Sequence, residues 1–293
     1  MTISVLRTPA ALKPTINGWR AAGLRIGFVP TMGALHEGHL SLMKQARERA
    51  DKVIVSVFVN PTQFAPHEDF SVYPRNEEND VRLLEAAGVD AVYIPGINDI
   101  YPIGAFSDMK AGSAARELEG ALRPTHFDGV VTVVARLFKH VDPDVAVFGE
   151  KDYQQLCVIR QMVQYLDLPV EIIGAPIVRD AHGLALSSRN AYLSADELAV
   201  ARKLNKVLFE TAKNMKQPGP DSGLLRSARN DEIMNEARQK LSEAGFDEVQ
   251  YLELRDAQTL ARMETSDRLL DRPARLLAAV KIGKTRLIDN VAV

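Results

Sequence analysis

The sequence lacks the features that mark secreted and membrane-spanning proteins. It has a single cysteine, Cys157, so no disulfide can form within the 293-residue chain. No stretch approaches the roughly 18 consecutive apolar residues of a membrane span, and the first residues do not have the pattern of a secretory signal. We therefore expect a cytoplasmic protein without a membrane partner. Cys157 lies in an apolar helical stretch, which predicts a buried structural thiol.

The chain also lacks an excess of charge of either sign. Its 36 Lys and Arg residues face 38 Asp and Glu residues, which gives a formal net charge of −2. Such a balance offers no bulk attraction for a nucleic-acid backbone, so nucleic acid is not an expected partner. A content of 46% hydrophobic and 25% charged residues is typical of a globular protein, and the length favours two domains.

The first part of the chain alternates between strand-like and helix-like segments. The strand-like runs cover residues 24–30, 52–60, 89–94, 145–149 and 170–174. The helical patterns cover residues from about 38 to 50, then 77–87, 128–140 and 152–166. This alternation predicts a doubly wound, Rossmann-like parallel α/β sheet over residues 1–177, with ligands at the C-terminal ends of its strands.

The pattern changes after residue 177. Helical segments at 195–213 and 231–244 are followed by β-like runs at 248–254, 275–281 and 285–289. Residues 178–293 are therefore predicted to form a smaller α+β domain. The turn-rich segment 217–223 is expected to be an exposed loop between two helices.

The stretch Pro30-Thr-Met-Gly-Ala-Leu-His-Glu-Gly-His-Leu40 lies at the first strand-to-helix connection. Gly33 and Gly38 allow the backbone to approach a phosphate, and a helix start presents free N–H groups with a partial positive charge. His36 and His39 lie three apart at this helix start, where both can point at a bound phosphate. We therefore predict an anion-binding site, although either histidine alone would be typical of an exposed helix start.

Three better-known motifs do not fit this stretch. The glycine spacing matches a P-loop, but His39-Leu40 stands where Lys-Ser or Lys-Thr is required. The two histidines are too close for the helical zinc motif, and no Gly-x-Gly-x-x-Gly follows the first strand. A P-loop NTPase, a zinc protease and a dinucleotide-dependent dehydrogenase are therefore disfavoured.

Three further clusters follow predicted strands or the predicted domain boundary. Asn60 and Gln63 place two amides at a strand end, which suits a small polar substrate, although Asn60-Pro61 is also a common turn signal. Lys151, in Gly149-Glu-Lys-Asp152, can bind a phosphate unless it is a solvated surface charge. Ser187-Ser188-Arg189 puts two hydroxyls and a guanidinium in one turn, a phosphate clamp that the second domain could bring over the first.

Taken in order, these motifs resemble the pantothenate synthetase (pantoate–β-alanine ligase) family, of the HIGH-motif nucleotidyltransferase superfamily. The matching motifs are Pro-Thr-Met-Gly-Ala-Leu-His-Glu-Gly-His, Val-Phe-Val-Asn-Pro-Thr-Gln-Phe, Tyr73-Pro-Arg75, Arg123-Pro-Thr-His126-Phe, Phe-Gly-Glu-Lys-Asp-Tyr-Gln-Gln, Leu-Ser-Ser-Arg-Asn, Tyr251-Leu-Glu-Leu-Arg-Asp256 and Thr285-Arg-Leu-Ile-Asp-Asn290. The resemblance covers nearly the whole chain. It implies that ATP and (R)-pantoate form pantoyl adenylate and pyrophosphate, after which β-alanine displaces AMP to give pantothenate.

The resemblance also implies roles for individual residues. Transition-state stabilisation falls to His36, His39, Lys151 and Arg189, with His39 at the position usually assigned as proton donor. The ATP-binding positions are Met32, Gly33, Ala34, Leu35, His36, Glu37, Gly38, His39, Gly149, Glu150, Lys151, Asp152, Val178, Leu186, Ser187, Ser188 and Arg189. Asn60, Gln63 and Gln155 match the pocket for pantoate and β-alanine.

The remaining expectations concern metal, assembly and departures from the family pattern. Mg²⁺ is expected with the ATP phosphates, but no carboxylate pair marks a protein-held metal site. The resemblance implies a homodimer, and the position of Ser187-Ser188-Arg189 makes the second domain a candidate lid over the ATP site. Leu186 stands where some relatives have Met, and the segment 217–230 matches no motif and is interpreted as a tolerated insertion between helices. A related nucleotidyltransferase acting on another small acid, and a nucleotide sensor without turnover, remain as alternatives.

Overall fold

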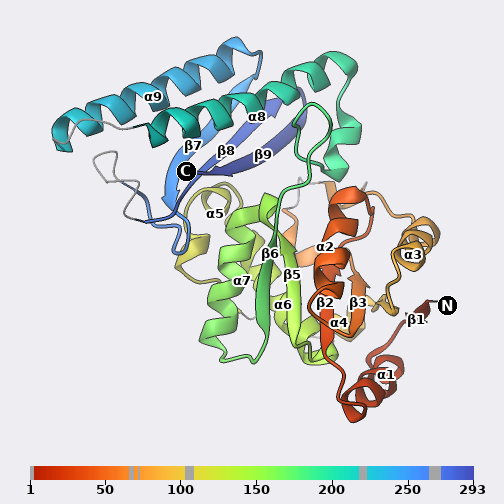
Figure 1. Cartoon of the computed structure of the whole chain (residues 1–293). Helices are drawn as coiled ribbons and strands as arrows, with labels where there is room; N and C mark the ends of the chain where they lie inside the picture. Colours follow the sequence, from red (N-terminus) through yellow and green to blue (C-terminus); the bar gives the residue numbers. More distant parts are fainter. Residues whose placement is uncertain (1–2, 66–68, 72, 103–108, 218–222, 264–271) are drawn as a thin grey trace. The chain divides into compact units, whose positions relative to one another are not determined.

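The structure is a computed structural model that describes residues 3–65, 69–71, 73–102, 109–217, 223–263 and 272–293. The chain divides into two units (Figure 1). The first unit contains Met1–Glu150 and Gln154–Pro176, and the second contains Lys151–Tyr153 and Ile177–Val293. The short segment Lys151–Tyr153 thus groups with the second unit, although the chain on both sides of it belongs to the first.

A six-stranded sheet forms the centre of the first unit, in the order β1-β4-β3-β2-β5-β6. Every pairing in it is parallel. The strands are β1 (Ser4–Leu6), β2 (Ile26–Thr31), β3 (Lys52–Val57), β4 (Ala91–Tyr93), β5 (Val145–Gly149) and β6 (Glu171–Ala175). From β2 the chain continues to β3, on one side of β2 in the sheet. From β5 it continues to β6, which lies on the opposite side of the sheet. The boundary between β2 and β5 is therefore the switch point at which doubly wound folds bind ligands.

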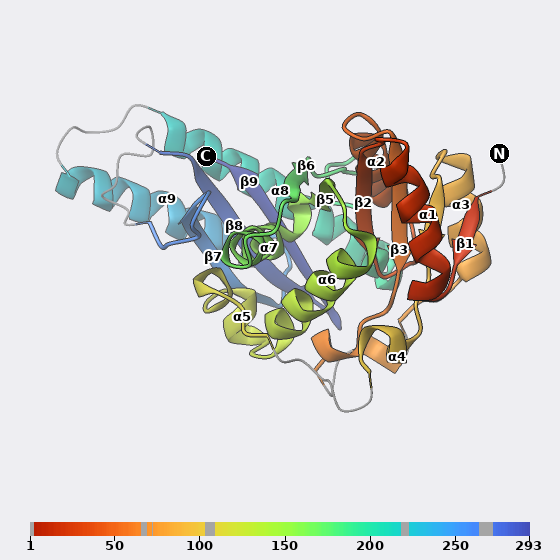
Figure 2. The same ribbon diagram turned by 90° about the horizontal axis from the view of Figure 1, so that it is seen from below.

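Helices cover both faces of this sheet (Figures 1 and 2). The α-helices of this part of the chain are α1 (Pro9–Ala21), α2 (Glu37–Arg47), α3 (Glu77–Ala86), α4 (Ile97–Ile100), α5 (Glu119–Leu122), α6 (His126–Val141) and α7 (Tyr153–Tyr165). Short 3₁₀ turns are η1 (Pro61–Gln63), η2 (Asp69–Ser71), η3 (Ser113–Ala115) and η4 (Glu150–Asp152). The predicted doubly wound α/β class is confirmed, and the predicted burial of Cys157 in α7 is confirmed as well.

Successive side chains of β2 explain why both faces are covered. Val29 belongs to a core cluster with Leu42 and Met43 of α2. Its neighbour Phe28 points to the other face, where its ring lies 6.1 Å from that of Phe138 in α6. Because alternate residues of a strand face opposite sides, a run that is apolar at every position needs a helix on each face.

Pro30 lies inside β2, which is unusual for a strand with neighbours on both sides. It pairs with Ser56 of β3, but β5 pairs with β2 only at Gly27 and Phe28. The missing N–H of Pro30 therefore costs no ladder bond on the β5 side. The expectation that the strand ends at Pro30 is wrong by one residue, because β2 continues to Thr31.

The second unit has a three-stranded antiparallel sheet in the order β7-β8-β9. Its elements are η5 (Ser188–Tyr192), α8 (Ala195–Lys216), α9 (Gly223–Glu243), β7 (Glu248–Asp256), β8 (Ala274–Ile282) and β9 (Thr285–Ala292). Helices α8 and α9 share an apolar core with the sheet, in which Leu208, Leu241 and Ala278 are fully buried. The predicted smaller α+β part is confirmed.

The prediction for the connection between α8 and α9 is partly wrong. We expected a loop to Gly223 and a helix from Asp231, but α9 already begins at Gly223. Residues 223–230 are therefore helical, and the side chain of Asn230 is buried. Residues 218–222 of the predicted loop lie outside the described residues.

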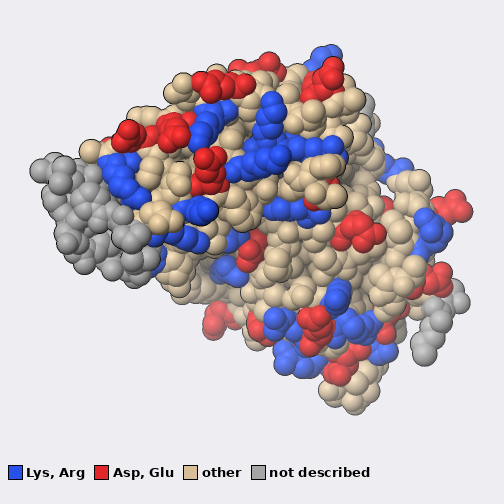
Figure 3. Space-filling model, turned by 45° about the horizontal axis from the view of Figure 1, so that its top comes forward, with Lys and Arg blue, Asp and Glu red and all other residues tan. Residues whose placement is uncertain are grey.

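Charges of both signs are interspersed over the surface of the second unit (Figure 3). Lys240 pairs with Glu210 at 2.8 Å and with Glu236 at 2.9 Å, and Arg202 pairs with Asp180 at 2.9 Å. In the part of the chain that the structure describes, no helix has the length and apolar character needed to cross a membrane.

Candidate active site

The loop between β2 and α2 passes twice through the left-handed backbone region. Gly33 has a φ of +79° and Ala34 a φ of +51°. Glycine adopts this conformation freely, whereas alanine adopts it at a cost because its Cβ approaches the backbone. A Cβ at position 33 would lie 2.8 Å from Asp80 Oδ2 and 3.1 Å from Val57 Cγ1. Glycine is therefore required at position 33.

Asp80 of α3 holds this loop in place. Its carboxylate accepts hydrogen bonds from Ala34 N at 3.0 Å and from Leu35 N at 2.9 Å. Burial raises the pKa of the Asp80 carboxyl, and the N–H donors of Leu35 and Ala34 oppose that rise. Sequence reasoning missed Asp80, because one carboxylate within a helix belongs to no recognisable motif.

His36 and His39 cap the start of α2 reciprocally. His36 Nδ1 accepts from Gly38 N at 3.1 Å, and His39 Nδ1 accepts from His36 N at 3.3 Å. A ring nitrogen that accepts carries no hydrogen, so each neutral imidazole has its hydrogen on Nε2. The two ring centroids lie 4.1 Å apart. The fold thus places two Nε2–H donors side by side just beyond the carboxyl end of β2.

Most backbone N–H groups of this loop are bonded within the protein. The bonded donors are the N–H groups of Gly33, Ala34, Leu35, His36, Gly38 and His39. The expectation that the helix start offers free N–H groups to a phosphate is therefore wrong for these residues. The predicted anion-binding site would therefore depend on side chains, and the role of His36 and His39 in it stays a prediction.

The amide cluster after β3 lies beside this loop. Gln63 Nε2 lies 3.2 Å from the Met32 sulfur, and Gln63 Oε1 accepts from Asn60 Nδ2 at 3.2 Å. The structure thereby brings together two segments that the sequence singled out separately. Asn60 is only 1% exposed, and its amide also donates to Gly129 O at 3.2 Å and accepts from Tyr101 Oη at 2.7 Å. Asn60 is thus placed to orient Gln63, and its direct contact with a substrate stays a prediction.

The backbone of Gln63 is held by residues to which sequence reasoning gave no role. Its carbonyl oxygen lies 2.9 Å from His126 Nδ1 and accepts from Arg123 Nη2 at 3.2 Å. Both residues belong to the Arg123-Pro-Thr-His126 motif of the family resemblance, which was the available signal. A Cβ at Gly129 would lie 2.5 Å from Thr62 O, so α6 can approach this turn only through a glycine.

Two adjacent glutamines begin α7, and they differ in burial. Gln154 is buried, donating to Ala114 O and Glu117 O at 2.7 Å each and accepting from Glu119 N at 2.9 Å. Gln155, the predicted pantoate contact, is half-buried. The buried glutamine therefore fixes the segment around η3 and α5, while the substrate role of Gln155 stays a prediction.

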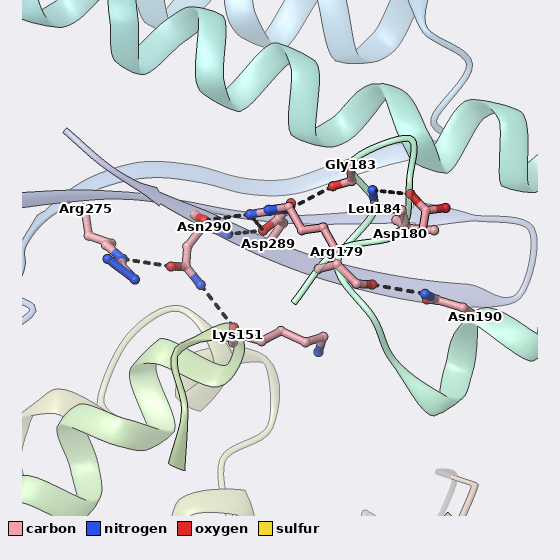
Figure 4. Close-up of polar contacts among 10 residues, drawn as sticks. Lys151, Arg179, Asp180, Gly183, Leu184, Asn190, Arg275, Asp289 and Asn290 are labelled. Atoms are coloured by element: carbon pink, nitrogen blue, oxygen red, sulfur yellow. Dashed lines mark hydrogen bonds and ion pairs between the residues drawn. The ribbon is translucent and has the colours of Figure 1, made fainter. Parts of the chain in front are cut away.

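In the second unit, residues 178–186 form a short hairpin (Figure 4). Leu186 N donates to Val178 O at 2.9 Å, and Arg179 bridges Ala185 in antiparallel fashion. The Asp180 carboxylate closes the turn by accepting the N–H groups of His182 and Leu184. This hairpin carries Val178 and Leu186, two of the predicted ATP-binding residues.

The predicted phosphate clamp follows this hairpin directly. Ser187 caps η5, and its Oγ accepts from Arg189 N at 3.3 Å. Asn190 Nδ2 donates to Ala185 O at 3.0 Å, which ties the turn back to the hairpin. Ser187, Ser188 and Arg189 therefore lie in one ordered 3₁₀ turn, and all three are half-buried.

Lys151 lies in η4, the turn that follows Gly149 at the end of β5. Its side chain is 22% exposed, and its Nζ lies 3.6 Å from Asp152 Oδ1. Its carbonyl oxygen accepts from Asn290 Nδ2 of β9 at 3.1 Å (Figure 4). Lys151 is thus a partly buried cation in a fixed turn.

The described residues contain no cluster of three or more His, Cys, Asp or Glu side chains that could hold a metal ion.

Comparison with known proteins identifies the family. A model described as pantoate-β-alanine ligase matches residues 4–292. The chain is 51% identical over 289 residues to the pantothenate synthetase of Mesorhizobium japonicum, covering 99% of this chain and 97% of that protein. It is 49% identical over 291 residues to the pantothenate synthetase of Rhodospirillum rubrum, covering 99% of each.

Solved structures agree with these relatives. The pantothenate synthetase of Thermus thermophilus is 41% identical with a TM-score of 0.82, covering 99% of each chain. The pantoate-β-alanine ligase of Francisella tularensis, solved in complex with β-γ ATP and β-alanine, is 33% identical with a TM-score of 0.78, covering 99% of this chain and 97% of that one. By sequence and by fold, this chain belongs to the pantoate-β-alanine ligase family.

Proposed function

We propose that this chain joins pantoate to β-alanine in two steps at the expense of ATP. In the first step a pantoate carboxylate oxygen attacks the α-phosphorus of ATP, the bond to the β-phosphate breaks, and pyrophosphate leaves. In the second step the β-alanine amine attacks the carbonyl carbon of pantoyl adenylate, the bond to AMP breaks, and the amine loses a proton. The products are pantothenate, AMP and pyrophosphate.

The observation that carries this proposal is the reciprocal capping of α2 by His36 and His39, which fixes both rings. Attack on phosphorus builds negative charge on phosphate oxygens, and donors fixed in advance stabilise such charge without reorganising. His36 and His39 meet that need, because their caps fix both rings and keep the hydrogen on Nε2. Neither residue has to act as a nucleophile, which fits transfer directly between the two substrates.

Cationic side chains supply the rest of the charge stabilisation in this proposal. Lys151 and Arg189 are expected to bind phosphate oxygens of ATP. The Lys151 carbonyl oxygen accepts from Asn290 Nδ2, and the Arg189 turn is bonded to the preceding hairpin through Asn190 Nδ2 and Ala185 O. The proposed ATP-binding set is the one named from the resemblance, Met32 to His39, Gly149 to Asp152, Val178 and Leu186 to Arg189.

Pantoate is proposed to bind at the amide cluster. Gln63 supplies a neutral side-chain amide that Asn60 orients. The backbone carbonyl of Gln63 is held by His126 and Arg123. Oriented amides suit a ligand with hydroxyl groups and a carboxylate, because they can both donate and accept. Gln155 is assigned to the same substrate, and Gln63 also faces the β-alanine side in the family pattern.

Magnesium enters the proposal as part of the substrate, MgATP. The ion neutralises charge on the phosphates, and most of its ligands are phosphate oxygens and water. Assembly as a homodimer, a cytoplasmic location and the roles of residues 1–177 as the binding domain and 178–293 as a lid remain predictions.

An assay of pyrophosphate release tests the proposed function. Purified protein with MgATP should release pyrophosphate when pantoate is added, whether or not β-alanine is present. Folded protein that binds ATP but shows no pantoate-dependent release would reject the proposal. A panel of other small carboxylic acids in the same assay distinguishes pantoate from the substrate of a related acid-adenylating enzyme.

A further inference from the structure

Two adjacent polar residues near the end of β9, Asp289 and Asn290, are buried in the second unit. Asp289 is 3% exposed and Asn290 is 2% exposed. Their partners across the sheet on β8 are Ala278 and Leu277, which have no polar side chains to pair with them. Burial of polar groups lowers stability unless each is bonded, which raises the question of what these two bond to.

Asp289 holds the base of the 178–186 hairpin. Its carboxylate pairs in a bidentate manner with Arg179, with Oδ2 2.6 Å from Nη1 and Oδ1 2.8 Å from Nη2. Arg179 also donates to Gly183 O at 3.0 Å, across the hairpin turn. The hairpin that leads into Ser187 and Arg189 is thus fixed to β9 at its first strand (Figure 4).

Asn290 holds the Lys151 turn. Its Nδ2 donates to Lys151 O at 3.1 Å, while its Oδ1 accepts from Arg275 Nε at 2.8 Å. The guanidinium of Arg275 lies 4.1 Å from the ring centroid of Tyr153, and Tyr153 Oη donates to Ala257 O at 2.7 Å. The segment Lys151–Tyr153 is therefore attached to the second unit at three points, and Asn290 makes the contact nearest to Lys151.

Neighbouring residues of one strand thus anchor two segments that both lie far from that strand in the sequence. The Asp289 contact to Arg179 spans 110 residues, and the Asn290 contact to Lys151 spans 139 residues. The two anchors are themselves linked, because Asp289 Oδ1 accepts from Asn290 N at 2.7 Å and Arg179 Nη2 approaches Asn290 O at 3.4 Å. A shift of β9 would displace both segments together.

We infer that Asp289 and Asn290 are positioning residues that set the Lys151 turn and the Arg189 turn in register with each other. The inference rests on the proposed function, in which Lys151 and Arg189 bind the phosphates of ATP. Positions of charged groups must be held within about 1 Å for full transition-state stabilisation, so loss of an anchor should slow the reaction more than it weakens ATP binding.

The variant Asn290→Asp tests the inference most selectively. Above the pKa of the new carboxyl it keeps an acceptor for Arg275 but places an oxygen opposite Lys151 O, so the donor is lost. We expect kcat for pantoate-dependent pyrophosphate release to fall at least tenfold, with KM for ATP changed less than threefold. If Asn290→Asp does not fold, Asn290→Ala removes the same contact without adding charge.

Leu287→Ala on the same strand is the matched control for stability. Leu287 is a core residue at 5% exposure and takes no part in the network. It should lower the melting temperature at least as much as Asn290→Asp does, yet leave kcat within twofold of wild type at 25 °C. A parallel loss of kcat in both variants would show a merely structural role and overturn the inference.

A double-mutant cycle identifies the residue through which Asn290 acts. In a Lys151→Ala background, Asn290→Asp should change kcat by no more than about twofold, because the group that it positions is already gone. The same large factor in both backgrounds would overturn the inference.

Failure of the proposed function would be recognised separately. If wild type releases no pyrophosphate with pantoate, the proposed function is rejected, and the inference, which rests on it, is rejected with it. Normal kcat in Asn290→Asp beside an active wild type would overturn the inference and leave the proposed function standing.

Discussion

The predicted ATP-binding segments of the two units are built in different ways. In the first unit, the two histidine rings are fixed by contacts over two and three residues, from Gly38 N to His36 and from His36 N to His39, while Asp80 of α3 holds the backbone before them. In the second unit, the Lys151 turn is fixed by a contact that spans 139 residues, and the hairpin before Arg189 by one that spans 110. One part is a local motif, and the other exists only once the second unit has folded.

This difference predicts different responses to substitution. A local motif has few anchors, so a change there should act directly on the groups that touch the substrate. A segment with several distant anchors should lose activity in smaller increments as single anchors are removed. The substitutions below test this contrast.

The largest effect is expected at His39. His39→Ala removes an Nε2–H donor, and we expect at least a hundredfold loss of pantoyl adenylate formation, with much less effect on ATP affinity. Pyrophosphate release and calorimetric ATP binding are the two measurements. Unchanged turnover would contradict the assigned role.

His39→Gln is the matched control for the helix start. A glutamine at this position can still accept the N–H of His36, as in an ordinary capping box. We therefore expect it to restore the stability lost in His39→Ala but not the activity. Recovery of activity together with stability would mean that His39 only caps α2.

A smaller effect is expected at Asp80. Asp80→Asn has one acceptor oxygen for two backbone N–H groups, so the loop at Ala34 and Leu35 loses a bond. We expect a fall of about tenfold in kcat and a destabilisation of about 1–3 kcal/mol. Wild-type kcat in this variant would show that the loop keeps its conformation without the carboxylate.

The stability of wild type relative to this variant should depend on pH in a defined direction. Burial raises the pKa of Asp80 above its ordinary value of 3.8, so the folded chain holds this proton more tightly than the unfolded chain. The contribution is fully present below the unfolded pKa and is lost as pH rises through the folded pKa. The free energy of unfolding of wild type minus that of Asp80→Asn should therefore decrease as pH rises above about 4. Urea unfolding of both proteins at a series of pH values measures this difference in free energy of unfolding, and a difference that increases with pH would contradict the account.

The smallest effect is expected at Tyr153 in the second unit. Tyr153→Phe removes the bond to Ala257 O but keeps the ring beneath Arg275. Since Asn290 still holds the turn, we expect kcat to fall by no more than about threefold. A loss as large as that of His39→Ala would contradict the difference between the histidine pair of the first unit and the Lys151 turn of the second.

The fold was largely predictable because its strands are encoded by local composition. Runs such as Val53–Val57 are apolar at nearly every position, which indicates a strand buried on both faces. The helix α1 was missed because Pro14 and Gly18 interrupt its pattern, although Thr8 caps it and Pro9 occupies its first turn. The start of α9 was misplaced because its first residues follow a turn-rich segment and show no apolar stripe.

The candidate site was predictable only where its contacts are local. His36 and His39 could be found from spacing at a strand end, and the amides Asn60 and Gln63 likewise. Asp80, Asp289 and Asn290 could not be given roles, because their partners lie 45 or more residues away along the chain. The expectation of free N–H groups failed for two reasons. The acceptor for Ala34 and Leu35 comes from α3, and His36 itself accepts the N–H groups of Gly38 and His39.

Pyrophosphate release from MgATP tests the central claim most directly. Wild-type protein is predicted to release pyrophosphate only when pantoate is present, without any need for β-alanine, and His39→Gln is predicted to lose this release while remaining folded. Release that requires β-alanine, or that persists at the wild-type rate in His39→Gln, would contradict the account.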